Sequence, residues 1–398
     1  MNVLMLTQVL PYPPDSGPKV KTWNVIKYLA QRHEVTLASF VRGDQSEDVR
    51  HLERYCRAVH TVPMHRGIWR DLWYAVASLF RNEPFLMVRD DRKAMRDLVD
   101  RLTAEVRFDI AHADQMNMAQ YAARVAGAGK ILDLHNALWL LYQRLWSTME
   151  PGPRRWMLGR DVRLLKRYEG QMCREFDAVL AVSEHDRAAL EKAAGRSLDV
   201  TVVPIAVDTD EITVVHREAG SRHILHIGTM YWPPNVEGVK WFVQEVYPLV
   251  RRQCPDVQFD VVGSRPSAEL LALNEAGLGV NVTGYVADPA PYLRRAALMV
   301  VPLHAGSGMR VKILNALAQG IPVVSTTLGA EGIAVTPGED VLLADEPADM
   351  AAACLHLLHN PDLGERLARN GRALMERRYD YRRACVPLDE VYARAREL

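Results

Sequence analysis

The sequence has no excess of charge of either sign. Lysine and arginine together number 49, and aspartate and glutamate together also number 49, so the formal net charge is zero. Extended binding to nucleic acid needs a strong basic excess. The composition therefore predicts no nucleic-acid partner, although a local basic patch is compatible with it.

Cysteines are few, and their spacing matches no common ligand pattern. The chain has five: Cys56, Cys173, Cys254, Cys354 and Cys385. Their number is odd and no two form a C-x-x-C pair, which argues against a disulfide framework and against a zinc site. Scattered thiols of this kind favour a reducing compartment.

Long hydrophobic runs are also missing. No apolar stretch approaches the roughly 20 residues that span a bilayer. The N-terminus opens on a strand-like run, Val3 to Leu6, without the basic region, apolar core and cleavage site of a signal peptide. We therefore expect a cytoplasmic protein and leave open a peripheral contact with the inner face of the membrane.

Short runs of Val, Ile and Leu alternate with helical patterns, and the series occurs twice. The expected strands are 3–6, 35–40, 58–62, 108–112, 130–134, 178–182 and 200–203, then 223–227, 257–262, 280–283, 298–302, 322–325 and 341–344. The expected helices include 19–31, 184–194, 236–252, 310–319, 347–359, 361–377 and 382–396. Runs that are apolar on both faces are typical of parallel strands between helix layers. The pattern predicts an α/β fold with two doubly wound parallel sheets, separated by the polar stretch 206–221.

The segment 298–331 carries the strongest chemical signal. An apolar strand runs into a loop with Gly306, Ser307 and Gly308, and a helix then opens with Arg310 and Lys312 in its first turn. Cations at the start of a helix oppose the helix dipole, but a phosphate bound there would stabilise both. The segment therefore favours a phosphate site over the alternative, a tight turn with two solvated cations.

This segment resembles the donor-binding region of the retaining glycosyltransferase family 4, which has the GT-B fold. Further matches follow in the same order along nearly the whole chain. They are the loop Pro11 to Gly17, Leu134-His135-Asn136, the strand-like run Phe176 to Ser183, Pro204 with Val207-Asp208, and His226-Ile227-Gly228 with Pro234-Asn235. Each motif alone is weak, whereas the ordered set is fairly specific.

The resemblance implies two Rossmann-like domains that face a central cleft. Residues 1–205 would bind the acceptor, 206–221 would link the domains, and 222–377 would bind the nucleotide sugar. The C-terminal helix, 378–398, would pack back on the first domain. The implied reaction is retaining and metal-independent, needs no cofactor, and uses a nucleotide-diphosphate sugar, with UDP or GDP expected.

The resemblance also implies the site residues. Arg310, Lys312 and His135 would be catalytic, and the N-terminal loop would contribute Asp15, Ser16 and Gly17. The donor-binding residues would be Gly228, Gly306, Ser307, Gly308, Met309, Asn315 and Glu331. The family commonly has glutamates at the positions of Ser307 and Asn315, so Asn315 would hold the ribose without the help of a charge.

Three features have competing interpretations. His135 is expected to touch the transferred sugar, and the alternative is a structural histidine bonded to local backbone. Asp208-Thr209-Asp210 has the Asp-x-Asp pattern that binds a metal in other proteins. Because the triplet lies in the expected linker, we interpret it as part of the linker and predict no metal. The 68–80 stripe, an apolar helical pattern, fits either a membrane-facing helix or, as we favour, a helix packed on its own sheet; it consists of Ile68, Trp69, Leu72, Trp73, Val76, Leu79 and Phe80.

A glycosyltransferase is the leading hypothesis. The alternatives are a pseudo-transferase, which the replaced glutamates would suit, and a sugar-nucleotide epimerase, for which no acid–base carboxylates can be placed. The acceptor, whether a glycan, a lipid-linked molecule or a small natural product, is left open, and so is the oligomeric state.

Overall fold

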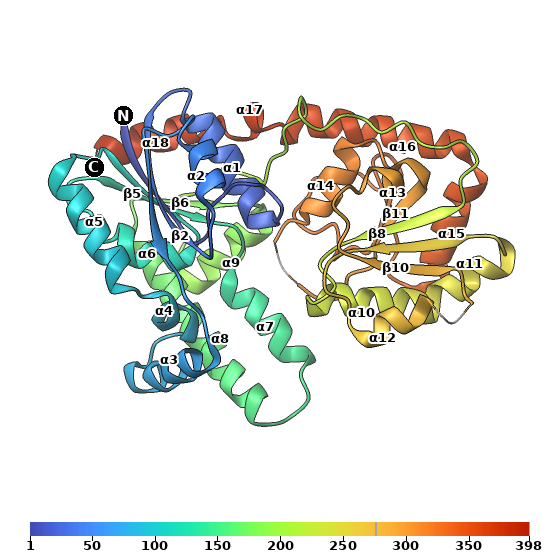
Figure 1. The fold of residues 1–398 in the computed structure, drawn as a ribbon, viewed down its shortest axis with the longest axis horizontal. Coiled ribbons are helices and arrows are strands. Elements are labelled where there is room, and N and C mark those ends of the chain that lie inside the picture. The colour runs from blue at the N-terminus through green and yellow to red at the C-terminus, as the bar shows by residue number, and fades with distance from the viewer. Residues whose placement is uncertain (275–276, 307, 398) are drawn as a thin grey trace. The chain divides into compact units, whose positions relative to one another are not determined.

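The computed structural model describes residues 1–274, 277–306 and 308–397. The chain divides into two compact units, each built around its own parallel sheet (Figure 1). Unit 1 comprises residues 1–206, 307–309 and 381–398, and unit 2 comprises residues 207–306 and 310–380.

Unit 1 has a seven-stranded parallel sheet in the order β3-β2-β1-β4-β5-β6-β7. The strands are β1 (Asn2–Thr7), β2 (Glu34–Val41), β3 (Ala58–Pro63), β4 (Ile110–Asp114), β5 (Gly129–Leu134), β6 (Ala178–Ala181) and β7 (Val200–Val202). The helices are α1 (Gly17–Leu29), α2 (Ser46–Leu52), α3 (Ile68–Arg81), α4 (Phe85–Asp90), α5 (Lys93–Glu105), α6 (Met116–Ala122), α7 (Leu138–Thr148), α8 (Pro153–Glu175) and α9 (Glu184–Ala194). The central strands are buried on both faces, as their continuous apolar runs predict.

Unit 2 has a six-stranded parallel sheet in the order β10-β9-β8-β11-β12-β13. The strands are β8 (His223–Ile227), β9 (Gln258–Val262), β10 (Val280–Gly284), β11 (Ala296–Val301), β12 (Val323–Ser325) and β13 (Leu342–Leu343). The helices are α10 (Pro233–Trp241), η1 (Phe242–Val246), α11 (Tyr247–Gln253), α12 (Ala268–Leu271), η2 (Ala272–Asn274), α13 (Ala290–Arg295), α14 (Val311–Ala318), α15 (Pro347–His359), α16 (Pro361–Leu374) and η3 (Met375–Tyr379).

After unit 2 the chain returns to unit 1 through α17 (Tyr381–Ala384) and α18 (Pro387–Glu397). In Figure 1 the red α18 lies beside the strands of unit 1. The approach is close: a Cβ atom on Gly129 of β5 would lie 1.9 Å from the carbonyl oxygen of Ala395. The hydroxyl of Tyr392 on α18 lies 2.7 Å from Nδ1 of His112 on β4.

Every strand expected from the apolar runs appears in the described part of the chain, with ends that differ by at most two residues. The expected helix 236–252 is interrupted, because α10 passes through the π-helical turn η1 before α11 begins. Pro248 lies directly after this turn and has no N–H for the bond to residue 244, so the helical hydrogen-bond pattern cannot continue there unchanged.

The expectation that the 68–80 stripe packs on its own sheet is wrong. These residues form α3, but the stripe points to solvent, with exposed fractions from 45% at Val76 to 88% at Phe80. The residue that α3 buries is Ser78. Periodicity shows that a helix has two unlike faces, but it does not show which face turns inward. Within the described residues, no helix is long and apolar enough to cross a membrane.

Candidate functional site

The candidate phosphate site of unit 2 lies at the carboxyl ends of β8 and β11. After β11 the chain passes through Gly306, and Arg310 takes an extended conformation as the N-cap residue of α14. Lys312 then lies in the first turn of this helix. Carboxyl ends of parallel strands and helix N-termini are where α/β proteins bind anions.

Lys312 is held by two acceptors, one on β8 and one on α10. Its Nζ lies 2.9 Å from Oδ1 of Asn235 and 3.4 Å from Nε2 of His226. Nδ1 of His226 lies 2.9 Å from the carbonyl oxygen of Val300, which can only accept, so this nitrogen carries the proton and Nε2 is left as an acceptor. Asn235 is oriented in turn, because its amide donates to the carbonyl oxygen of Thr229 at 3.0 Å. His226 and Asn235 therefore fix the position of the ammonium group.

The electrostatics of this cluster favour an added anion. Burial lowers the pKa of Lys312 to about 7, and the positive charge of Arg310 acts in the same direction. Burial, followed by the charge of Lys312, also holds the pKa of His226 well below its ordinary value. A phosphate placed beside Lys312 and Arg310 would reverse the penalty on both cations.

Two glycines of this site leave room that a side chain would fill. A Cβ atom on Gly228 would lie 2.7 Å from Nζ of Lys312, and one on Gly306 would lie 3.1 Å from Nη2 of Arg310. Gly306 also has a φ of +118°, which other residues rarely adopt. The glycines thus permit the two cations to lie against the backbone of the loops.

The remaining expected donor residues lie on several segments of the chain. Gly308, with a φ of +76°, and Met309 are buried and group with unit 1. Asn315 is half-buried on α14, three residues after Lys312, and Glu331 is half-buried in a turn that follows β12. Ser307 lies outside the described residues.

His135 follows β5 in unit 1 and is 9% exposed. Its Nε2 lies 2.9 Å from Oδ1 of Asp114, the last residue of the neighbouring strand β4. The hydroxyl of Thr22 on α1 lies 3.0 Å from both oxygens of that carboxylate and 2.8 Å from the carbonyl oxygen of Pro18. His135 is therefore bonded to a carboxylate side chain rather than to local backbone.

A second buried carboxylate lies beside this group. Lys21 of α1 forms an ion pair with Asp133 of β5, and Nε2 of His112 lies 3.5 Å from the same carboxylate. Burial alone would raise the pKa of Asp133, but Lys21 and the nearby histidines outweigh it and hold the pKa below its ordinary value. Asp133 is therefore ionised, and Lys21 supplies the neutralising charge.

Asp114, Asp133 and His135 each offer one ligand atom within 4.8 Å of the others, a spacing that would admit a metal ion. Lys21 already neutralises Asp133, and Asp114 is held by hydrogen bonds to Thr22 and His135. A metal at this position would compete with Lys21 for the charge of Asp133.

The N-terminal loop and the Asp-x-Asp triplet have local roles. Asp15 pairs with Lys19 at 3.1 Å, Ser16 is the N-cap residue of α1, and Gly17 is the first residue of that helix. In the triplet, Oδ1 of Asp208 accepts from the backbone N–H of Asp210 at 3.1 Å. That bond and one from the next residue make a local turn of the kind aspartate commonly forms.

The sequence interpretation missed the residues that position the charged groups. In unit 2 these are His226 and Asn235, which the sequence shows only as parts of motifs. In unit 1 they are Lys21, Thr22, His112, Asp114 and Asp133. A signal for the last two was present, because each falls near the end of an expected strand, where polar residues of neighbouring parallel strands meet.

Two family models match the chain in order. The model described as Glycosyltransferase Family 4 matches residues 16–211, and the model described as Glycosyl transferases group 1 matches residues 221–360. A Klebsiella pneumoniae protein, described as an uncharacterized 44.6 kDa protein in the cps region, is 20% identical over 95% of this chain and 96% of its own length. A phosphatidyl-myo-inositol mannosyltransferase of Mycobacterium leprae is 29% identical over 54% of this chain and 58% of its own length.

Solved structures share the fold over nearly the whole chain. The crystal structure of Anabaena Alr3699/HepE in complex with UDP is similar with a TM-score of 0.69 and 16% identity, covering 99% of this chain and 100% of that one. A structure of the same Anabaena protein in complex with UDP-glucose has a TM-score of 0.68 over 99% of each chain.

Proposed function

Because the chain belongs to glycosyltransferase family 4 and has the GT-B fold, we propose that it transfers a sugar from a UDP-sugar to an acceptor. The proposed reaction retains the configuration at the sugar carbon and needs no divalent metal. The Anabaena protein of the same fold binds UDP and UDP-glucose, which supports UDP over GDP as the donor nucleotide.

The observation that carries this proposal is the Lys312 cluster of unit 2. Its ammonium is fixed by Asn235 and His226, and Arg310 supplies a second positive charge beside it. When the sugar leaves, negative charge builds on the diphosphate. Cations that are already in place stabilise that charge without reorganisation, which lowers the barrier.

His135 supports a role in holding the sugar. The carboxylate of Asp114 can only accept, so Nε2 of His135 donates to it and Nδ1 is left as an acceptor. Nδ1 is buried and has no hydrogen-bond partner among the described residues. A sugar hydroxyl is a donor that fits this nitrogen.

Metal independence is supported by two side chains whose positive charge can take the place of a metal ion. Arg310 and Lys312 can neutralise the diphosphate, and Asp208 of the Asp-x-Asp triplet is engaged by backbone N–H groups. Turnover that is unchanged by EDTA is the expected result. Loss of activity in EDTA that Mn²⁺ or Mg²⁺ restores would overturn this part of the proposal.

A cytoplasmic location is supported by the thiols. All five cysteines are buried and none of them forms a disulfide bond in the described part of the chain, as suits a protein that folds under reducing conditions.

The test is a thermal-shift screen with UDP, GDP, ADP and TDP, followed by transfer assays with the matching sugars. A nucleotide at a hundredfold its Kd should stabilise the protein by about 2.7 kcal/mol. UDP should stabilise the wild type and Lys240→Met, a lysine on α10 of the same unit, but not Lys312→Met. Stabilisation by none of the four would remove the donor site, whereas stabilisation without turnover would favour a pseudo-transferase.

A further inference from the structure

Helix α3 of unit 1 turns its apolar face away from the protein. All seven members of the 68–80 stripe are at least 45% exposed, and Trp69 and Phe80 reach 83% and 88%. Single exposed apolar residues are common on protein surfaces, but a continuous apolar face is typical of a binding surface.

Polar contacts fix this orientation from the other side of the helix. The hydroxyl of Tyr74 accepts a hydrogen bond from the guanidinium of Arg92. The hydroxyl of Ser78 donates to the carbonyl oxygen of Glu83 at 2.7 Å, and Arg160 of α8 donates to the carbonyl oxygen of Ser78 at 2.6 Å. Rolling α3 to bury the stripe would break the contacts with Arg92 and Arg160.

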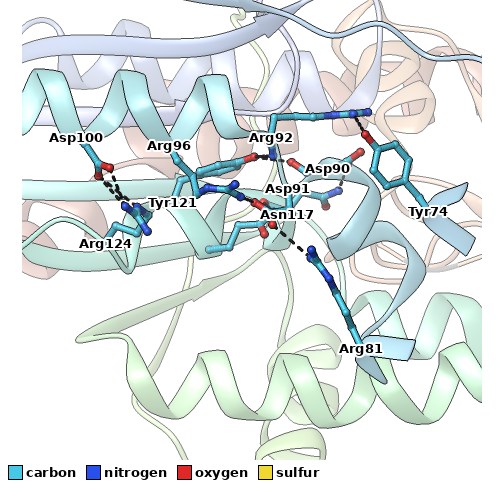
Figure 2. A network of polar contacts seen from close by, with 11 residues as sticks. Tyr74, Arg81, Asp90, Asp91, Arg92, Arg96, Asp100, Asn117, Tyr121 and Arg124 are labelled. Carbon is cyan, nitrogen blue, oxygen red and sulfur yellow. Dashed lines mark hydrogen bonds and ion pairs between the residues drawn. The ribbon is translucent and has the colours of Figure 1, made fainter. Parts of the chain in front are cut away.

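Figure 2 shows the same anchoring, with Tyr74 pointing toward Arg92 and Arg81, the last residue of the helix, pointing toward Asp91. Nη1 of Arg81 lies 3.6 Å from Oδ2 of Asp91, which also pairs with Arg96 of α5. The exposed stripe is therefore a fixed feature of unit 1.

The residues around the stripe favour a lipid surface as its occupant. At 3.6 residues per turn, Arg70 and Arg81 lie roughly 60–80° beyond Trp73 on the helix, so both flank its tryptophan edge. Tryptophan and phenylalanine on one face with arginine beside them are typical of helices that lie in the headgroup region of a bilayer. Tryptophan suits this region because its ring is apolar and its N–H still reaches water.

The start of α8 extends the same kind of surface. Trp156 and Met157 are 64% and 49% exposed, and the exposed Arg154 precedes them. They lie about one turn before Arg160, which bonds to α3 through Ser78. Exposed apolar side chains beside exposed cations thus occur on two helices that contact each other.

We propose that α3 docks unit 1 on an anionic lipid bilayer. Trp69, Trp73 and Phe80 would enter the boundary between headgroups and acyl chains, and Arg70 and Arg81 would meet the lipid phosphates. This inference is independent of the transfer reaction and needs no assumption about the acceptor.

The test is co-sedimentation of the full chain with vesicles of phosphatidylcholine, with or without one third phosphatidylglycerol. The wild type should bind the mixed vesicles more tightly than the neutral ones, and the difference should shrink in high salt. Binding to neither kind of vesicle at millimolar lipid would overturn the proposal.

The variants change only exposed residues, so that a loss of binding does not reflect a loss of folding. Trp69→Ser with Phe80→Ser should lower the partition coefficient for mixed vesicles about thirtyfold. Arg70→Glu should lower it about tenfold while leaving binding to neutral vesicles unchanged. The matched control is Tyr285→Ser, which removes an aromatic side chain that is 78% exposed in unit 2, and it should bind as the wild type does.

A second copy of the chain is the competing occupant. Sedimentation velocity without lipid distinguishes the two occupants. If the stripe binds lipid, the wild type and the Trp69→Ser, Phe80→Ser double variant should have the same oligomeric state. A wild-type dimer that this variant dissolves would mean that the stripe is a subunit interface, and the lipid proposal would be wrong.

Discussion

We expect the binding of UDP to take up a proton, because Lys312 is the group proposed to meet the diphosphate. Burial and Arg310 lower its pKa to about 7 in the nucleotide-free protein. A single negative charge about 4 Å from the ammonium contributes about 4 kcal/mol at an effective dielectric constant of 20. At 1.36 kcal/mol per pK unit, this would raise the pKa of Lys312 by about three units, close to its ordinary value.

The size of the effect follows from the fraction of Lys312 that is already charged. Only the protonated form binds well, and that fraction falls from about one quarter at pH 7.5 to about one hundredth at pH 9 when the pKa is near 7. We therefore expect the affinity for UDP to fall about twenty-five-fold over this range, in which the terminal phosphate of UDP is already ionised.

Calorimetry in buffers of different ionisation enthalpy measures this directly. At pH 8 the wild type should take up close to one proton per UDP, and Lys312→Met should take up none and bind weakly at every pH. Lys240 of α10 pairs instead with Glu269, at 2.7 Å. The control Lys240→Met should therefore behave as the wild type. Equal proton uptake by the wild type and Lys312→Met would refute the assignment.

The stability of the nucleotide-free protein should change with pH in the opposite direction to the affinity for UDP. A lysine whose pKa is lowered on folding binds fewer protons in the folded state than in the unfolded state between about pH 7 and pH 10. The free energy of unfolding should therefore rise with pH across this window in the wild type, and rise less in Lys312→Met. Urea titrations at the two ends of the window provide the check.

Three further substitutions test single contacts. Gly228→Ala should weaken UDP binding about tenfold with little change in Tm, because its Cβ would lie 2.7 Å from Nζ of Lys312 and would displace the ammonium group; unchanged affinity would count against the cluster. Asp114→Asn should reverse the tautomer of His135 and reduce kcat about tenfold or more, and steady-state kinetics with an unaltered rate would contradict the proposed role. Glu169→Gln should lower the free energy of unfolding by about 1–3 kcal/mol, measured in urea, since its two oxygens accept the N–H groups that begin α7 at 2.7 Å each.

How much was predictable differs between the sheets and the polar clusters. The strands were predictable because parallel strands that are buried on both faces are written as continuous apolar runs, and each such run became a strand. The ion pair between Lys21 and Asp133 was not predictable, because it joins residues that are 112 positions apart and depends on how α1 crosses β5. His226 shows the intermediate case: its motif was recognised, but its role as an acceptor for Lys312 follows only from the bond that it makes to Val300.

The 68–80 stripe shows a limit of a different kind. The pattern predicted the helix correctly but not the direction of its apolar face. That direction depends on the hydrogen bonds that the polar face makes with the rest of the chain. Here Tyr74 accepts a hydrogen bond from Arg92 and Ser78 accepts one from Arg160, and these contacts turn the stripe outward. A rule that apolar stripes belong in the core fails where polar anchors of this kind exist.

The last prediction concerns Asn315, where the family commonly has a glutamate. Asn315 lies three residues after Lys312 on α14 and is half-buried. If it holds the ribose, Asn315→Glu should tighten UDP binding by about 1 kcal/mol, near fivefold, because a carboxylate accepts two hydroxyl hydrogen bonds better than an amide does. The new carboxylate would also be within reach of Lys312, since residues three apart on a helix are neighbours.

Inorganic pyrophosphate separates these two effects, because it carries the charge of the diphosphate but no ribose. A gain for UDP alone, measured by calorimetry at pH 7, would mean that position 315 contacts the ribose. Equal gains for UDP and pyrophosphate would mean that the carboxylate acts by keeping Lys312 protonated, and the proton uptake on binding should then fall as well. Weaker binding of UDP by Asn315→Glu, with pyrophosphate unaffected, would show that this chain uses a ribose contact unlike that of its family.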